Sequence, residues 1–359
     1  MASKEKQLTE QAAIVERPYS QRFWVVRAEG GTYLGNFRLG QCVAIGHLDE
    51  LGIPSDSERP YQVDPIALRD RVERHFADRE FTKSKLTSHW SQISYFLFEM
   101  KPGDWVVSVD DNRLLIGRIV GKPRYNTDPI DYVHDIDTGR LTRMTLGLRR
   151  AVQWGPSIIR GNLPSAVTRT LRANQTVFNV DDHWQTLYHL VYPAFSFEDR
   201  LYLSAKVQQQ NSIDNLSVSK FLTLMSELEA FVRGDFPDSM IGDAAEVAID
   251  DALNDGYDSG SLTLSTQAEF MSPGDIWSVL EHLKNFDYYA AFYFGYSALF
   301  GSSVLGWDGL LDLHTRQRVM DFIAKRWEGR SGKQIRARLK LRLPSFDTKS
   351  LEDESKDEK

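Results

Sequence analysis

Glycine, proline and aspartate divide residues 22–180 into short runs of β-branched and aromatic residues, and this division restricts the fold of the chain most strongly. The runs "RFWVVRA" (22–28) and "CVAIGHL" (42–48) lie on either side of a glycine-rich stretch that we expect to be a flexible loop. "DWVVSVDDNRLLIGRIVG" (104–121) predicts a hairpin that turns at Asp-Asp-Asn, and "RRAVQW" (149–154) predicts a further strand. Short strands in this order are typical of a small, partly closed β-barrel.

Two helices are expected between these strands. In "DPIALRDRVERHF" (64–76) an aspartate stands at the N-cap and a proline at the first helical position. Its apolar residues recur near helical spacing, and they are Ile66, Leu68, Val72 and Phe76. "SQISYFLFEM" (91–100) is the second candidate helix.

The character of the chain changes near residue 181, and the second half predicts a mostly helical domain. Residues 181–205 begin with a pair of aspartates and place Trp184, Leu187, Tyr188 and Val191 on one helical face. Further helices are expected at 217–234, 242–256 and 310–329, and a strand at 261–270. "SPGDIWSVLEHL" (272–283) has serine and proline at the positions that begin a helix, and "GKQIRARLKLR" (332–342) alternates like a strand. The predicted fold class is therefore α+β.

The length of 359 residues predicts two domains, which we place at residues 21–180 and 181–345. We expect residues 1–20 to be a flexible arm and residues 346–359 to be a disordered acidic tail. The single cysteine, Cys42, lies in an apolar run and is interpreted as a packing residue of a cytoplasmic protein. The uncharged stretch at residues 288–307 predicts a buried helix rather than a membrane span.

The first half resembles the EVE/YTH-like branch of the PUA superfamily, as found at the N-terminus of prokaryotic modification-dependent restriction and defence proteins. The resemblance covers about half the chain and rests on the order of three segments, "FWVVRAEGGTYLGNFRLGQCVAIG" (23–46), "MKPGDWVVSVDDNRLLIGRIVGKPRYN" (100–126) and "LRRAVQWGPSIIRGNLPSAVTRTLRANQTVFNV" (148–180). It implies a small barrel that reads DNA or RNA carrying a modified base, which is turned out of its stack into an aromatic slot. DNA is favoured over RNA on this analogy alone.

A flipped base needs aromatic walls and an amide or hydroxyl group at its edge. We therefore expect stacking by Trp90 and Tyr33, and recognition of the base edge by Ser91 and Gln92. Trp24 and Trp105 lie on predicted strands and are further candidates for base binding. The alternative is that the tryptophans on strands, which include Trp154, belong to the core.

Because the net charge of the chain is -7, any contact with phosphates must come from a local group of cations. The candidates for phosphate binding surround the predicted slot in sequence, and they are Lys83, Lys85, Lys122, Arg124, Arg149, Arg150 and Arg160. The alternative is that these cations are scattered over a solvated surface.

The sequence contains no recognisable catalytic motif. Glu99-Met100-Lys101 runs directly into Pro-Gly-Asp and is interpreted as a turn, and the eight histidines are dispersed, so neither a metal nor a cofactor is expected. The first hypothesis is therefore a non-catalytic sensor of modified DNA in antiviral defence, with a separate nuclease or effector subunit and self-association as possible partnerships. The alternatives are a modification-dependent nuclease with a diverged C-terminal domain, and a membrane-associated or protein-interaction effector.

Overall fold

The computed structural model divides the chain into two compact units between residues 186 and 187. The N-terminal unit comprises residues 19–186, and the C-terminal unit comprises residues 187–345 together with the segment before residue 19. The residues that the structure describes are 14–77, 82–135, 140–160, 163, 165–171, 175–207, 215–234, 243–268, 274–281, 291–293, 295–296 and 341–342.

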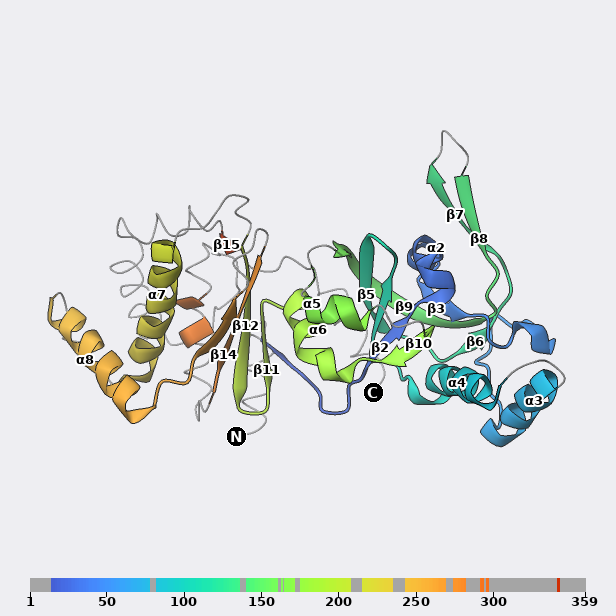
Figure 1. The fold of residues 1–359 in the computed structure, drawn as a ribbon, viewed down its shortest axis with the longest axis horizontal. Coiled ribbons are helices and arrows are strands. Elements are labelled where there is room, and N and C mark those ends of the chain that lie inside the picture. Colours follow the sequence, from blue (N-terminus) through green and yellow to red (C-terminus); the bar gives the residue numbers. More distant parts are fainter. Residues whose placement is uncertain are drawn as a thin grey trace. The chain divides into compact units, whose positions relative to one another are not determined.

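A curled half-barrel sheet forms the centre of the N-terminal unit (Figure 1). Its strands lie in the order β10-β2-β4-β5-β9-β3, and β6 also pairs with β9. The pair β2 and β4 is parallel, whereas the other pairs are antiparallel. The strands are β2 (Phe23–Val26), β3 (Cys42–Ile45), β4 (Trp105–Val109), β5 (Arg113–Ile119), β6 (Arg124–Tyr125), β9 (Leu148–Ile159) and β10 (Val177–Asn179).

The long strand β9 joins two parts of this sheet, because residues 148–151 pair with β3 and residues 152–159 pair with β5. The register between β5 and β9 shifts between Leu115 and Gly117, and such a bulge bends and twists a strand. A Cβ at Gly117 would lie 2.6 Å from the carbonyl oxygen of Gln153, so the close approach of β9 at this point requires glycine.

The predicted hairpin is confirmed as β4 and β5, which pair in antiparallel register. The carboxylate of Asp110 accepts hydrogen bonds from the backbone N–H groups of Asn112 at 2.7 Å and Arg113 at 2.6 Å. The side chain of an aspartate at this position closes the turn.

Helices α3 (Pro65–Ala77) and α4 (Lys83–Ser94) bury one face each in the core of the N-terminal unit. The predicted start of α3 is confirmed, because the Asp64 carboxylate accepts a hydrogen bond from the N–H of Ala67 at 2.9 Å. Leu68, Val72 and Phe76 are buried as expected, whereas Ile66 is 73% exposed and does not belong to the apolar face. The last turn after α4 is the π-helical η3 (Tyr95–Glu99). Shorter elements of this unit are η2 (Asp49–Leu51), α5 (Ser165–Thr170) and η5 (Asp181–His183).

The expectation of a flexible loop between β2 and β3 is wrong. This segment contains the short 3-10 turn η1 (Ala28–Gly31) and the helix α2 (Leu34–Leu39). Leu34 and Phe37 lie three residues apart and are both buried, so they hold one face of α2 on the core. The glycines in the sequence concealed this helical spacing.

Strands β7 (Ile130–Asp135) and β8 (Arg140–Met144) form a two-stranded ribbon outside the main sheet, and this ribbon projects from the N-terminal unit (Figure 1). The buried side-chain amide of Asn36 on α2 donates hydrogen bonds of 2.7 Å to the carbonyl groups of Ile130 and Thr142. One amide group therefore holds both strands at the base of the ribbon.

The C-terminal unit combines helices with a six-stranded sheet, of which the sequence predicted only the strands at residues 261–270 and 332–342. Five strands follow the order β1-β11-β12-β14-β13, and β15 pairs with β12. The strands are β1 (Val15–Glu16), β11 (Ala194–Phe197), β12 (Arg200–Val207), β13 (Ser265–Ala268), β14 (Gly274–Leu280) and β15 (Leu341–Arg342). The described helices are α6 (Trp184–Val191), which spans the division between the units, α7 (Asn215–Arg233) and α8 (Asp243–Ser259).

Two sequence expectations fail where distant strands pair. The segment predicted to begin a helix at residues 272–283 forms β14, because seven of its residues pair with β12 and four pair with β13. The part of the expected arm that is described also has structure, since β1 pairs with β11 in parallel and Ile14 is buried. Local cap signals cannot compete with this number of backbone hydrogen bonds and buried side chains. Residues 1–13 and 346–359, the helix at 310–329 and most of the strand at 332–342 lie outside the described residues.

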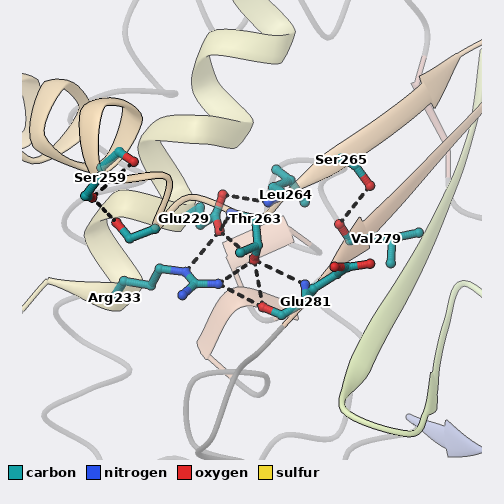
Figure 2. A network of polar contacts seen from close by, with 10 residues as sticks. Glu229, Arg233, Ser259, Thr263, Leu264, Ser265, Val279 and Glu281 are labelled. Carbon is teal, nitrogen blue, oxygen red and sulfur yellow. Dashed lines mark hydrogen bonds and ion pairs between the residues drawn. The ribbon is translucent and has the colours of Figure 1, made fainter.

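A buried carboxylate joins α7 to the end of the sheet (Figure 2). Glu229 accepts hydrogen bonds from Arg233 Nε at 2.9 Å, from the N–H of Thr263 at 2.7 Å and from the N–H of Leu264 at 3.0 Å. Arg233 and the Thr263 hydroxyl in turn donate to the carbonyl group of Glu281, which follows β14. The network satisfies backbone groups that neither helix nor sheet would otherwise pair.

Five residues of the apolar stretch at 288–307 are described, and they are helical and buried. A Cβ at Gly295 would lie 2.6 Å from Leu228, so this stretch packs closely on α7. Among the described residues, no helix is both long and apolar enough to cross a membrane.

Candidate functional site

A pocket of about 390 Å³ lies along α4 in the N-terminal unit. Residues from α4 and η3 form most of its described lining, and Gln175, from the segment before β10, completes it. The lining residues of α4 and η3 are Ser84, Thr87, Ser88, Ser91, Gln92 and Tyr95.

These residues line one pocket because they recur at intervals of three and four, which places them on one face of a helix. Ser88, Ser91, Gln92 and Tyr95 are half-buried, whereas Ser84 at the start of α4 is exposed. The described lining therefore consists of hydroxyl and amide groups and one aromatic ring.

Ser91 and Gln92, which the sequence predicts to read a base edge, both line this pocket. The Ser91 hydroxyl donates a hydrogen bond of 2.9 Å to the carbonyl group of Thr87. The Gln92 side-chain oxygen accepts hydrogen bonds from the N–H groups of Thr176 at 2.7 Å and Val177 at 3.1 Å. Gln92 therefore holds β10 against α4, and its oxygen is already used by the backbone.

Trp90 and Tyr33 do not belong to the described lining of the pocket. One residue along an α-helix is a rotation of about 100°, so Trp90 points away from the face that carries Ser91. Its ring packs against Phe98 with a centroid separation of 6.4 Å, and both Trp90 and Tyr33 lie half-buried against the core of the unit. The structure thus separates the predicted stacking residues from the predicted edge residues.

Tyr95 is the aromatic residue that the sequence interpretation missed. Its ring lies 5.5 Å from that of Trp24, tilted by 44°, and it also lines the pocket. Its spacing of four residues from Ser91 within the helix predicted at 91–100 could have identified it, and α4 begins earlier than predicted, at Lys83, which adds Ser88 to the same face.

The base-binding roles expected of Trp24 and Trp105 are wrong, because only 0% and 2% of these residues are exposed. Trp24 Nε1 donates a hydrogen bond of 3.1 Å to Asp104, whose carboxylate also accepts from the N–H of Arg22 and the N–H of Lys101. Both tryptophans belong to the core, as the alternative interpretation proposed.

The phosphate-binding roles expected of Arg149 and Arg150 are also wrong. Only 2% of Arg150 is exposed, and its guanidinium donates to the carbonyl groups of Phe96, Leu97 and Gly121 at 2.7, 3.1 and 3.1 Å. Burial lowers the pKa of Arg150 to about 10. Arg149 is buried too, and it donates to two carbonyl groups, those of Leu146 and Asp128. Both arginines therefore stabilise the fold.

The other predicted cations differ in their surroundings. Arg160 donates to the carbonyl group of Asp110 at 2.9 Å, and Arg124 donates to that of Ser57 at 3.1 Å, while Lys122 is exposed. Lys83 and Lys85 are exposed on the first turn of α4, on either side of the lining residue Ser84 in sequence.

The first turn of α4 therefore combines two lysines with the partial positive charge of a helix N-terminus. No acidic residue occurs in α4 to offset this charge. Cations at this end of a helix reduce its stability, and a local conflict of this kind is typical of a functional position. Lys83 and Lys85 are thus exposed cations of this turn, but neither belongs to the described lining of the pocket.

Comparisons with known protein families, with curated proteins and with solved structures found no match to this chain. The resemblance of the N-terminal half to EVE/YTH-like domains therefore stays a prediction. Within the described ranges, no group of three or more histidine, cysteine, aspartate or glutamate side chains is arranged to hold a metal ion.

Proposed function

We propose that the N-terminal unit binds nucleic acid, DNA in preference to RNA, and holds one modified base in the pocket along α4. In this proposal the protein is a cytoplasmic sensor of modified DNA in a prokaryotic antiviral defence or restriction-like system. The observation that carries the proposal is a polar pocket of about 390 Å³ along α4 whose described lining includes Ser91, Gln92 and the ring of Tyr95.

The dimensions and the chemistry of the pocket suit a flipped base. Pockets that enclose small ligands span about 300–1,000 Å³, so this volume accepts a base with a substituent. Tyr95 provides one ring for stacking, which contributes about 1–3 kcal/mol per base. This stacking offsets the few kcal/mol that are needed to take a base out of its duplex.

The lysines account for the position of the sugar-phosphate chain in this proposal. A base in the pocket has phosphates on both sides, and in this proposal the exposed Lys83 and Lys85 of the first turn of α4 contact them. Each phosphate that a cation neutralises releases counterions, so such contacts bind phosphates of any sequence. The pocket then supplies the preference for a modified base.

The test compares the full chain with three single-residue variants in fluorescence anisotropy with modified and plain duplexes. We expect wild-type protein to prefer at least one modified duplex, Tyr95→Ala to lose this preference, and Tyr95→Phe to retain it because the ring remains. Tyr257→Ala is the matched control, since Tyr257 is 84% exposed on α8 in the C-terminal unit. Thermal unfolding shows whether Tyr95→Ala is folded. Equal affinity of the wild-type chain for all duplexes would contradict the proposal.

A further inference from the structure

The described lining of the α4 pocket contains no charged residue and no aliphatic residue. Each of these described side chains carries a hydroxyl or an amide group. A methyl substituent in such a pocket would cover these polar groups without giving them hydrogen-bond partners, which costs free energy. An anionic substituent would meet no cation among the described lining residues.

The polar groups that line the pocket offer both donors and acceptors. The hydroxyl of Thr87 donates to the carbonyl group of Lys83 at 2.9 Å, so its oxygen is left to accept, as is that of Ser91. The side chains of Ser88 and Gln175 form no hydrogen bond within the described residues, and each can both donate and accept. A ligand with several O–H groups matches this arrangement because each O–H also donates and accepts.

The aromatic part of the pocket also differs from a slot for a bare base. Tyr95 is the one ring among the described lining residues, and its ring is tilted against the buried Trp24. A base held by stacking alone is best placed between two rings, whereas a pyranose ring packs its C–H face against the negative face of a single aromatic ring. The volume of about 390 Å³ leaves room for such a ring beside a base.

We infer that the modification which this pocket reads is a bulky, neutral polyhydroxyl group, such as a hexosyl substituent on a base, rather than a methyl group. The inference rests on the proposed function of the N-terminal unit. Ser88 on α4 and Gln175 before β10 determine the preference by hydrogen bonds to the hydroxyl groups of the substituent.

The experiment measures the affinity of the full chain for four duplexes of one sequence, at one salt concentration. They carry cytosine, 5-methylcytosine, 5-hydroxymethylcytosine or glucosylated 5-hydroxymethylcytosine at a single position. We expect the glucosylated duplex to bind about tenfold more tightly than the methylated one, since two additional hydrogen bonds contribute about 0.5–1.5 kcal/mol each. Ser88→Ala and Gln175→Ala should each weaken binding of the glucosylated duplex several-fold, and by more than they weaken binding of the other three duplexes.

The control variants carry the same two types of substitution, serine to alanine and glutamine to alanine, at positions outside the pocket. Ser226→Ala on α7 and Gln267→Ala on β13 alter the same residue types in the C-terminal unit, and they should leave every affinity unchanged. Methyl glucoside is added as a competitor, because a site for free saccharide would bind it as tightly as the duplex and would overturn the inference.

The outcomes separate the inference from the proposed function. Tightest binding of the methylated duplex, or equal binding of the three modified duplexes, would overturn the inference while a preference over plain cytosine still supports the proposed function. Equal affinity for all four duplexes would overturn both.

Discussion

Replacement of Arg150 by methionine distinguishes a structural cation from a phosphate-binding cation. The guanidinium of Arg150 is buried and donates to three carbonyl groups, those of Phe96, Leu97 and Gly121. Methionine keeps the apolar part of the side chain but provides no donor. A carbonyl group that loses its donor in the interior costs about 1 kcal/mol or more, so we expect the free energy of unfolding to fall by about 3 kcal/mol.

The opposite result is expected for the two lysines on α4. Lys83 and Lys85 are exposed, so the double variant K83Q/K85Q should change the free energy of unfolding by no more than about 0.5 kcal/mol. If each lysine neutralises one phosphate, the slope of log affinity against log salt should decrease by about 2 in this variant. Arg150→Met should leave this slope unchanged.

Both quantities are measured on the same preparations. Urea unfolding followed by tryptophan fluorescence gives the stability, and anisotropy with a labelled duplex between 50 and 200 mM salt, about the range over which phosphate contacts weaken most, gives the slope. An Arg150→Met protein of unchanged stability with a reduced slope would refute the reasoning, because it would mean that the guanidinium contacts phosphate. An unchanged slope in K83Q/K85Q would remove the lysines from the proposed interface.

Three further predictions concern buried groups. Burial lowers the pKa of His189 to about 3, so the unfolded chain gains a proton below its ordinary pKa of about 6.5 while the folded chain does not. The free energy of unfolding should therefore fall as the pH decreases from 6.5 towards 3, by up to about 1.4 kcal/mol per pH unit. The fall should be less steep in the double variant H189F/S204A, in which the second substitution removes the hydroxyl bonded to His189. Glu229→Ala should lower the free energy of unfolding by about 3 kcal/mol in urea, because three donors lose their acceptor. Burial raises the pKa of Cys42 to about 11, so its thiol should not react with a disulfide reagent at about pH 8 until the protein is unfolded.

Each of these predictions has a control or a contradicting outcome. Glu73 on α3 forms an i, i+4 pair with Arg69, in the reverse order to Glu229 and Arg233 and on the surface, so Glu73→Ala should cost no more than about 0.5 kcal/mol. If Glu73→Ala and Glu229→Ala lowered the free energy of unfolding equally, the larger effect expected for the buried Glu229 would be refuted. The His189 prediction would be refuted if the stability of H189F/S204A fell as steeply with decreasing pH as that of the wild-type protein. The Cys42 prediction would be refuted by rapid modification of Cys42 in the native protein.

Five strands of the N-terminal unit, β2, β3, β4, β5 and β9, and the cap of α3 could be predicted because they depend on neighbouring residues. The turn at Asp110 and the start of α3 at Asp64 each use a side chain that bonds to the backbone two or three residues away. Patterns of this length are present in the sequence itself. For the same reason α7 and α8, each with its own apolar face, were predicted near their observed positions.

The tertiary structure decided what depends on distant residues. Residues 274–280 have the local signals of a helix, yet they pair with β12, which lies about 70 residues earlier in the chain. Arg150 is charged and was expected at the surface, yet it is buried and donates to carbonyl groups within η3 and just after β5. The residues next to Arg150 in sequence do not show which distant carbonyl groups will accept hydrogen bonds from its guanidinium.

The candidate site shows both cases within residues 90–95. The sequence alone determined that Ser91 and Gln92 carry groups suited to a base edge, and it placed them beside Trp90. Adjacent residues on a helix differ by about 100° in direction, so the fold turned Trp90 to the core and brought Tyr95 to the pocket instead. Chemical character belongs to each residue, but which residues share a surface depends on how their helix packs.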